Sequence, residues 1–445
     1  MAQIKRLKRG LDINIIGNAD STNVSIDKNT DIFAISPSDF PGITWKLSIK
    51  LGDKVMIGSP ILHDKESEKI FLTSPVSGEI DQIIRGERRK IEYVIIKSDK
   101  KEEHISFSKP QSKDEAIDLL CKSGLWSMMR QRPYDIIPNP KANARDIFIT
   151  SFDSAPLAQP IMDISDIDYL EEGIKLLSQL TTGKIYLGVK FGSGISSSIA
   201  EVTEYHGPHP CGNVGIQIAN TKPVNKGETV FTLDAATAIR IGKLLITGKL
   251  DTTTKVAITG PLARNPHIIQ TKFGAAIQTI LNDEIKLSAH NPRIISGNVL
   301  TGIKVGVDND FLHFPYRQIT IIEEGNDADE FIGWASMNPN KYSVKHSFPA
   351  FLKGLKKPFN FDARINGGHR AMIVSGEYDK VFPMDIYPEF LIRAIMNEDI
   401  DKMEQLGIYE VAPEDFALAE FVDTSKLPLQ EIVRNGLETL RIEIS

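Results

Sequence analysis

The stretch SGLWSMMRQRPYD (123–135) combines aromatic and guanidinium side chains at close spacing. Trp126, Arg130, Arg132 and Tyr134 fall within nine residues, where a predicted helix gives way to a predicted strand. Aromatic faces and guanidinium donors suit a planar ring that carries carbonyl groups, such as a quinone. The same residue types are enriched at protein interfaces. The pattern therefore predicts either a quinone contact or an interface at these four residues, and the interface is favoured.

The loop HGPHPCG (206–212) brings together residue types that bind metals. His206, His209 and Cys211 would leave a fourth position open, as in a catalytic zinc site. Two prolines and two glycines make the loop stiff, which favours a structural role for its histidines. The other cysteine is Cys121, and two thiols cannot build an all-cysteine iron–sulfur cluster or a Cys₄ zinc site. We therefore predict no metal site, and so few cysteines fit a reducing compartment.

The loop FGSGISS (191–197) is the candidate for a nucleotide-phosphate cradle. It follows a predicted strand and reads G-x-G-x-x-S, so its backbone amides could approach a pyrophosphate at a helix N-terminus. One glycine of the usual three is missing and no acidic partner follows at the expected distance, so an ordinary loop is favoured. The sequence has no HExxH, GxSxG or Walker-type motif. The residue chemistry alone therefore predicts no catalytic residue.

Composition places the chain among ordinary globular proteins of several domains. It has 445 residues, 41% of them hydrophobic, with 52 Lys+Arg against 58 Asp+Glu. The net charge of −6 argues against a general nucleic-acid partner. The basic N-terminus lacks the apolar run of a signal peptide, and no window reaches the roughly 18 to 20 apolar residues of a membrane span. From Glu398 onward, twelve acidic and four basic residues predict a solvated acidic surface or, less favoured, a docking face for a basic partner.

The first unit is predicted to be all-β. Residues 44–97 alternate apolar and polar residues at close to period two, between turns marked by glycine and proline. KLGDKVMIGSPIL and SPVSGEIDQII resemble the biotinyl/lipoyl domain, a barrel-sandwich hybrid. Lys65, in HDKES, lies near the position of that family's modified lysine. A longer hairpin and crowded charges favour a plain structural barrel over a carrier of a covalent arm.

The rest of the chain alternates helix and strand and then becomes helical. Helices are predicted over 114–124, 166–180 and 234–248, with strands at 146–152 and 184–192, which indicates an α/β layer with a mostly parallel sheet. A small α+β module is predicted next, because a strand, a helix and a second strand follow one another. The first strand begins at 255, the helix carries Phe273, Ile277, Ile280 and Leu281, and the second strand spans 293–305. After Lys356, two apolar stripes predict helices. The stripes are Ile392, Met396, Ile400 and Met403, and Leu429, Ile432, Val433, Leu437 and Leu440.

From end to end, the chain resembles the A subunits of the Na⁺-translocating NADH:quinone reductases. The matching segments occur in one order: KRGLDINIIG, FLTSPVSGEI (71–80), SGLWSMMRQRPYDIIP, SFDSAPLA (151–158), LLSQLTTGKIYL (176–187), GPHPCGNVG (207–215), RIISGNVLTG (293–302) and FPMDIYPEFLIR (382–393). The family's complex passes electrons from NADH to quinone and pumps Na⁺. The resemblance implies a peripheral subunit on the cytoplasmic side of the bacterial inner membrane, which contributes to ubiquinone reduction and to assembly. Its implied partners are the other members of a six-subunit complex, especially a membrane subunit.

The family is more distantly similar to the flavin subunit of complex I and to the Rnf C subunit. These relatives hold FMN in a loop of the form GLRGRGGAGFP, and the matching stretch here, from Gly124 to Gln131, keeps only its start. Side chains then fill the space that a close backbone approach to phosphate needs. The relatives' iron–sulfur cysteines align with eight residues that carry no thiol: Met372, Ser375, Tyr378, Phe382, Val411, Glu414, Ala417 and Phe421. The resemblance therefore implies that flavins and the Fe–S cluster reside on other subunits, with no NADH, FMN or Fe–S site in this chain.

Together these observations predict four units. They are an N-terminal segment with a barrel-sandwich hybrid (1–104), a Rossmann-like α/β domain (105–254), a β-grasp (SLBB) module (255–330) and a helical domain that resembles an Fe–S domain without cysteines (331–445). The leading hypothesis is the peripheral subunit, whose isolated chain is not expected to catalyse a reaction. A stand-alone flavin- or nucleotide-dependent oxidoreductase using FGSGISS is the alternative, and a lipoyl-type carrier using Lys65 is the third.

Overall fold

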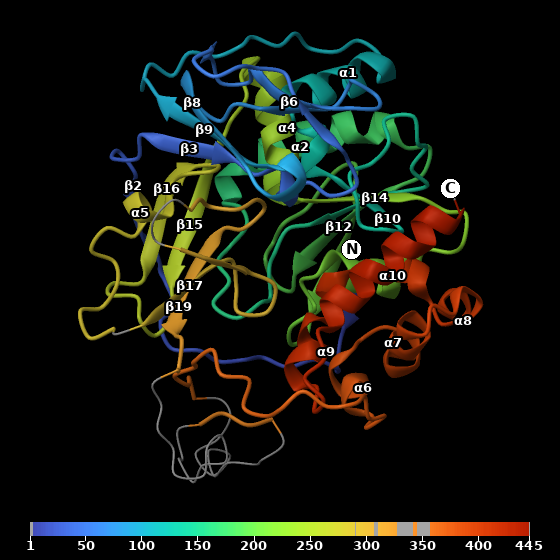
Figure 1. Ribbon diagram of the computed structural model, residues 1–445. Coiled ribbons are helices and arrows are strands. Elements are labelled where there is room, and N and C mark those ends of the chain that lie inside the picture. The colour runs from blue at the N-terminus through green and yellow to red at the C-terminus, as the bar shows by residue number, and fades with distance from the viewer. Residues whose placement is uncertain (1–2, 290, 307–309, 327–340, 345–356, 445) are drawn as a thin grey trace.

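The computed structural model describes residues 3–289, 291–306, 310–326, 341–344 and 357–444. Within them the chain forms four sheets and a C-terminal group of helices (Figure 1). No helix in these ranges is both long and apolar enough to cross a bilayer.

The predicted all-β unit is confirmed as two small sheets around one core. Ile80, Val94 and Ile96 are buried between them, at the alternating positions expected of half-buried strands. One sheet has the order β3 (Ile32–Ile35), β9 (Ile91–Ser98), β8 (Gly78–Arg85) and β5 (Lys54–Val55). The other has the order β4 (Trp45–Leu47), β6 (Pro60–Asp64) and β7 (Phe71–Thr73).

The predicted α/β layer is confirmed as a six-stranded sheet with helices on both faces. Ile147 and Ile149 pack in one core with residues of α2 (Ile167–Leu177) and α4 (Ala235–Thr247), while Phe148 packs with residues of α3 (Val214–Thr221). Five strands are parallel, and the last pairs antiparallel with β14. Their order is β1 (Gln3–Arg6), β13 (Glu201–His206), β12 (Ile185–Lys190), β11 (Ile147–Thr150), β14 (Val230–Asp234) and β10 (Arg130–Arg132).

Helices α1 (Lys113–Ser123) and α4 begin within one residue of their predicted starts and end at the predicted glycines. The Ser112 hydroxyl caps α1 by accepting the Glu115 N–H, and Asp234 caps α4 through the Thr237 N–H. Gly124 and Gly248 end the two helices in the left-handed conformation that glycine adopts at low cost. The cap of α4 places Asp234 at the carboxyl end of β14, which matters for the site below.

The α+β module is a third sheet, and its predicted helix is mostly wrong. Phe273 directly follows a strand, and α5 (Ile277–Ile280) has only four residues. Gly274 has φ +69° and lies so close to the Ala34 carbonyl that no helix can pass through it. The sheet order is β18 (Ile303–Val305), β17 (Pro292–Ser296), β19 (Gln318–Glu323), β15 (Thr253–Thr259), β16 (His267–Lys272) and β2 (Asp20–Ile26).

The C-terminal residues are helical as predicted, but the first stripe spans two helices. Glu398 has φ +54° and breaks the stripe, so Ile392 and Met403 are buried while Met396 is exposed. The second stripe is confirmed, since Leu429, Val433, Leu437 and Leu440 are buried. The helices are α6 (Glu377–Val381), α7 (Pro388–Met396), α8 (Ile400–Gln405), α9 (Ala417–Val422) and α10 (Leu429–Ile444).

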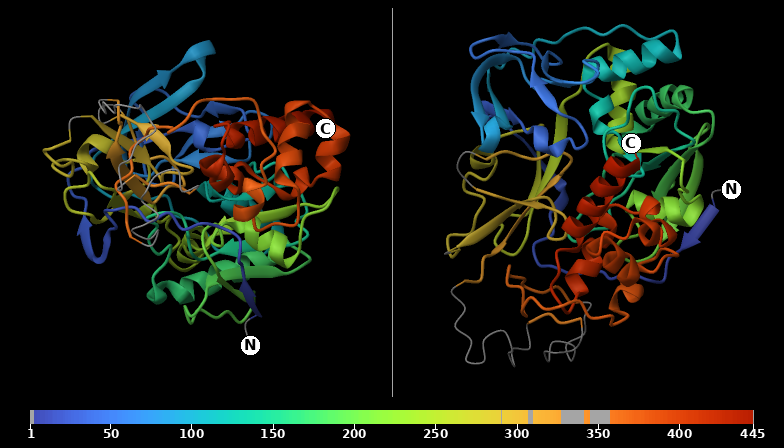
Figure 2. Two further views of the ribbon diagram at one scale, coloured as in Figure 1. Left: turned by 90° about the horizontal axis from the view of Figure 1, so that it is seen from below. Right: turned by 45° about the vertical axis from the view of Figure 1, so that its right-hand side comes forward.

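The first 26 residues do not stay with the barrel. β1 pairs with β13 of the α/β sheet, and β2 pairs with β16 of the third sheet. Residues 1–104 therefore contribute strands to all four sheets, and the turned views of Figure 2 show the N-terminus at an outer edge of the molecule. The predicted border between 330 and 331 lies outside the described residues.

Candidate functional site

A cavity of about 660 Å³ opens at the carboxyl ends of β11 and β14. The chain leaves β11 through α2 to β12 on one side, and returns through α3 to β14 on the other side. The connections diverge at such a switch point and leave a crevice, which is where open α/β sheets bind ligands. Thr150 and Asp234, the paired last residues of the two strands, both line the cavity.

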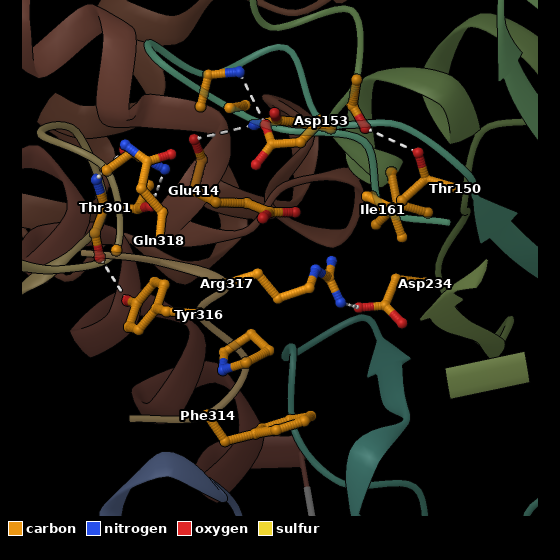
Figure 3. Close-up of a pocket in the computed structure, with 18 of the residues that line it drawn as sticks. Thr150, Asp153, Ile161, Asp234, Thr301, Phe314, Tyr316, Arg317, Gln318 and Glu414 are labelled. Atoms are coloured by element: carbon orange, nitrogen blue, oxygen red, sulfur yellow. Dashed lines mark hydrogen bonds and ion pairs between the residues drawn. The ribbon is translucent and has the colours of Figure 1, made fainter. Parts of the chain in front are cut away.

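The other walls come from the rest of the molecule (Figure 3). The third sheet contributes the segments 297–301 and 314–318, and the helical domain contributes Glu414 and Arg434. Apolar side chains cover another part of the wall: Val24, Ile161, Ala257, Ile268 and Ile303. The cavity therefore has a charged region and an apolar region, and it exists only where several units meet.

Arg130 and Phe314 form a cationic and aromatic corner of this cavity. The guanidinium donates to the backbone carbonyls of Ser127, Met129 and Asp39 at 2.9–3.1 Å. It lies 6.0 Å from the centroid of the Phe314 ring, which stacks on Phe40 at 5.2 Å. Within the described part of the chain no carboxylate forms an ion pair with Arg130. Burial lowers the pKa of Arg130, but the group stays cationic, so this corner offers a positive charge and a flat apolar face.

Asp234 and Arg317 form an ion pair at the same cavity. Arg317 Nη1 donates to Asp234 Oδ2 at 2.8 Å, while Oδ1 accepts the Thr237 N–H at 2.7 Å (Figure 3). Burial works to raise the pKa of Asp234, but Arg317 and Arg240 outweigh it and hold the pKa at about 2. Asp234 is therefore an anion that fixes the direction of Arg317 at the cavity.

Arg132 anchors the helical domain against the α/β sheet. Its side chain is 1% exposed and contacts Asp415 at 3.3 Å, Glu414 at 3.0 Å and Asp135 at 3.7 Å. Arg434 of α10 donates to the Asp135 carboxylate at 2.6 Å and to the Tyr134 carbonyl at 2.9 Å. Burial raises the pKa values of Glu414 and Asp415, Arg132 opposes the rise, and their acidic neighbours add to it. Three carboxyl groups thus share two guanidinium groups in one wall of the cavity.

The structure brings two of the four predicted site residues to the cavity. Arg130 and Arg132 line it, but Trp126 is 1% exposed, with its indole N–H donating to the Pro138 carbonyl at 2.7 Å and its ring edge-on to Phe231. Tyr134 is partly buried and packs against the helical domain. Trp126 and Tyr134 therefore support the backbone around the two arginines without reaching the cavity themselves.

The most informative cavity residues were not singled out from the sequence. Asp234, Phe314, Tyr316 and Arg317 come from two strand ends that are 80 or more residues apart. The available signals were FPYRQ (314–318), which groups two aromatics with an arginine, and an aspartate at the start of the predicted helix 234–248.

The three residues predicted as metal ligands point to different partners. His209 is buried and its Nδ1 lies 3.0 Å from Ser154 Oγ, while the Cys211 thiol donates to the Gly207 carbonyl at 3.2 Å. His206 is exposed and lies edge-on to Phe191. Among the described residues, no three His, Cys, Asp or Glu side chains converge as metal ligands would.

The glycine loop lacks the setting that a nucleotide-phosphate cradle requires, whereas the position of Lys65 is compatible with both of its interpretations. The loop 191–197 runs from β12 directly to β13, so no helix N-terminus follows it to receive a phosphate. Lys65 lies exposed in the turn between β6 and β7.

The positions aligned with FMN- and cluster-binding residues do not fit those groups. In the stretch after Gly124, the Met128 and Met129 amides already donate to carbonyls of the same turn, so they are not free for a phosphate. Tyr378, Phe382, Val411 and Ala417 are buried in the apolar core of the helical domain. Phe382 packs on Phe416 at 4.8 Å, so side chains occupy this core directly.

Three family models match consecutive parts of the chain. Residues 5–99 match the NqrA N-terminal barrel-sandwich hybrid domain, residues 111–250 the NqrA second alpha/beta domain, and residues 255–306 the NQRA C-terminal domain. The three matches follow the order of the first three units in the structure.

Curated relatives match over nearly the full length. A protein of Rhodopirellula baltica is 33% identical over 99% of this chain and 98% of its own length. Proteins of Neisseria meningitidis and Hahella chejuensis are 34% and 33% identical over 98% of this chain and 99% of theirs. All three are named as the A subunits of Na(+)-translocating NADH-quinone reductases. Two structures of an NAD⁺-reducing [NiFe]-hydrogenase match 41% and 48% of the chain at 12% identity, with TM-scores of 0.27 and 0.31, which is too distant to support an argument.

Proposed function

Because this chain belongs to the family of the A subunits of the Na⁺-translocating NADH-quinone reductases, we propose that it is a peripheral subunit that contributes to quinone reduction and to assembly. In this proposal its partners are the other members of the complex, and especially a membrane subunit. It faces the cytoplasm at the bacterial inner membrane. Its α/β and third units are Rossmann-like and SLBB-like, and the isolated chain does not catalyse the reaction.

The cavity corner of Arg130 and Phe314 is the observation that carries the quinone part of the proposal. A quinone head is flat and bears two carbonyl acceptors, which suits an aromatic face beside an arginine that forms no ion pair with any carboxylate among the described residues. The apolar wall that includes Ile161 and Ile268 suits the start of an isoprenoid tail.

The reaction adds two electrons and two protons to the ring and converts both carbonyls to hydroxyls. In the proposal, the electrons come from NADH through flavins and an Fe–S cluster on other subunits. Arg130 would orient one carbonyl and stabilise the negative charge that develops on its oxygen, since a fixed cation in a sheltered cavity acts strongly there. Arg317, oriented by Asp234, also lines the cavity and would act in the same way on a carbonyl within its reach.

The proposal assigns no NADH, FMN or Fe–S site to this chain. The bonded amides after Gly124 and the apolar core around Phe382 support that assignment. An absorption spectrum of the purified chain tests it, because a flavin or cluster band would contradict it.

Fluorescence titration with a short-chain ubiquinone tests the quinone site. Trp45 lies edge-on to Phe40 at 6.4 Å, and Phe40 stacks on Phe314, so a quinone bound at this corner should quench Trp45. We expect saturable quenching, weakened about tenfold or more in Arg130→Met because a charge-assisted hydrogen bond is lost. Arg264→Met removes an exposed guanidinium away from the cavity and should leave the affinity unchanged. Equal affinity in the two variants, or no quenching in the wild type, would contradict the proposed site.

A further inference from the structure

Five cations gather where β1 and β12 end, and we call them the basic edge: Lys5, Arg6, Lys8, Arg9 and Lys190. The parallel register places Lys5 and Lys190 on either side of Tyr205, and Arg6 beside His206. In the part of the chain that the structure describes, none of the five side chains forms an ion pair. β1 is the edge strand of its sheet, and Figure 2 shows it on the outside of the molecule.

The opposite end of the same sheet behaves differently. Lys184, at the start of β12, forms an ion pair with Glu201 at the start of β13. A second basic segment, the hairpin 85–90, is also partly satisfied, because Arg85 donates to the Arg89 carbonyl and Glu87 and Glu92 lie within or beside it. The basic edge therefore differs from the hairpin in having no glutamate or aspartate within its own segments 5–9 and 190, whereas Glu87 lies among the hairpin's cations.

Apolar side chains are exposed among these cations. Ile4 is 50% exposed and Phe191, directly after Lys190, is 43% exposed. Exposed apolar groups set among lysines and arginines are typical of surfaces that rest in the headgroup layer of a membrane.

A groove of about 910 Å³ runs beside the basic edge. Lys190, Phe191 and His206 line it, together with the loop 152–158. Its acidic residue nearest the N-terminus, Asp12, is engaged by the His209 backbone N–H at 2.9 Å. Phe152, Asp153, Ala155 and Ala158 line both this groove and the cavity of the candidate site. A surface docked at the basic edge would therefore lie one loop away from that cavity.

We propose that the basic edge docks this chain on anionic phospholipid headgroups. Cations without partners gain from a negatively charged bilayer, and a row of flexible side chains needs no shape complementarity to do so. The exposed Phe191 and Ile4 favour a lipid surface over an acidic protein, since both can enter the headgroup layer between the cations. The proposal stands on this surface alone and does not depend on quinone binding in the cavity.

Co-sedimentation of the full chain with lipid vesicles tests the docking surface. We expect binding to vesicles that contain phosphatidylglycerol, little binding to pure phosphatidylcholine, and loss of binding at about 1 M salt, where screening acts within about 3 Å. Replacing Arg6, Lys8 and Arg9 by serine should weaken binding about fivefold per charge, or roughly 100-fold in total. Because these side chains form no ion pair with the residues that the structure describes, the thermal midpoint should not change. Phe191→Ser should weaken the binding that persists at moderate salt.

The matched control removes three charges from the hairpin. Arg88→Asn, Arg89→Asn and Lys90→Ser respect the positive φ of the two arginines, which asparagine tolerates. We expect this variant to bind vesicles like the wild type. Equal loss in both triple variants would show a nonspecific charge effect, and wild-type indifference to phosphatidylglycerol would exclude a lipid surface and leave an acidic protein as the partner. Either result would overturn the proposal.

Discussion

Arg132 shows how one side chain can carry a structural and a site role together. It lines the cavity while it holds Asp415 and Glu414 of the helical domain. Removing a buried charge partner of this kind leaves carboxylates uncompensated, so Arg132 is fixed by the fold. Its type and its neighbours in the sequence indicated a site. Its partners Asp415 and Glu414 lie more than 280 positions away, and no local pattern could predict whether it would meet a ligand or these carboxylates.

Glu414 should make stability depend on pH near neutrality. The surrounding cavity wall desolvates this carboxyl group, although 42% of its side chain is exposed, and raises its pKa from the ordinary 4.5 to about 8, with Arg132 opposing and Asp415 adding to the rise. Between these values the folded chain holds a proton that the unfolded chain releases, so stability should fall as the pH rises from about 4.5 to 8. Asp234, with a pKa of about 2, affects stability in a more acidic pH range. Its contribution to folding stability is present above pH 3.8 and is lost as the pH falls through 2.

The variant Glu414→Gln isolates this effect because glutamine cannot ionise. We expect its urea midpoint to match the wild type near pH 5 and to exceed it near pH 8. Glu172→Gln on the exposed side of α2, where the partner is Lys175, should follow the wild type at both pH values. If Glu414→Gln and the wild type lose stability in parallel from pH 5 to pH 8, the raised pKa is not the cause.

At the scale of elements, two glycines set the distance between α2 and α4. A methyl group on Gly242 would overlap the Tyr169 carbonyl, and one on Gly173 would overlap the Ala238 carbonyl. The backbones therefore approach more closely than any side chain allows. This contact fixes α4, whose N-terminus is capped by Asp234 at the cavity.

Gly242→Ala should destabilise the chain even though alanine favours helix by about 1 kcal/mol. The added methyl group would clash with backbone atoms, which cannot rotate away, so the two helices must separate. Overpacking of this kind typically costs about 1–3 kcal/mol, which exceeds the gain in helix propensity. We expect the thermal midpoint to fall by several degrees. Gly368→Ala is the control, because an added methyl there meets nothing within 4 Å. An unchanged midpoint in Gly242→Ala would show that the two helices are not fixed by this contact.

Elements could be predicted where local chemistry decides them. Ser112 and Gly124 mark both ends of α1, and Asp234 and Gly248 both ends of α4. The helix predicted around Phe273 failed because Gly274 packs on Ala34 of the barrel, more than 200 residues away. The apolar residues Phe273, Ile277, Ile280 and Leu281 follow one another at spacings of four, three and one, which suits a helix. Contact between two backbones that are distant in the sequence decided the structure instead.

At the scale of the whole molecule, the cavity is a junction between units. The N-terminal strands β1 and β2 each join a different sheet, and the helical domain closes the wall through Glu414 and Arg434. No single unit contains the site. The sequence predicted the order of the units and two of the lining arginines, but the site required the spatial arrangement.

A quinone bound in the cavity should therefore protect several units at once. With a short-chain ubiquinone, we expect slower hydrogen–deuterium exchange in 128–132, 297–301, 314–318 and 413–434, because a ligand that touches every wall opposes the opening of each. β8 and β9, which contribute no residue to the cavity, should exchange as before. Arg130→Met should abolish the protection in all four segments together. Protection limited to one wall, or found instead at 191–197, would place the ligand elsewhere and show that the units do not enclose it jointly.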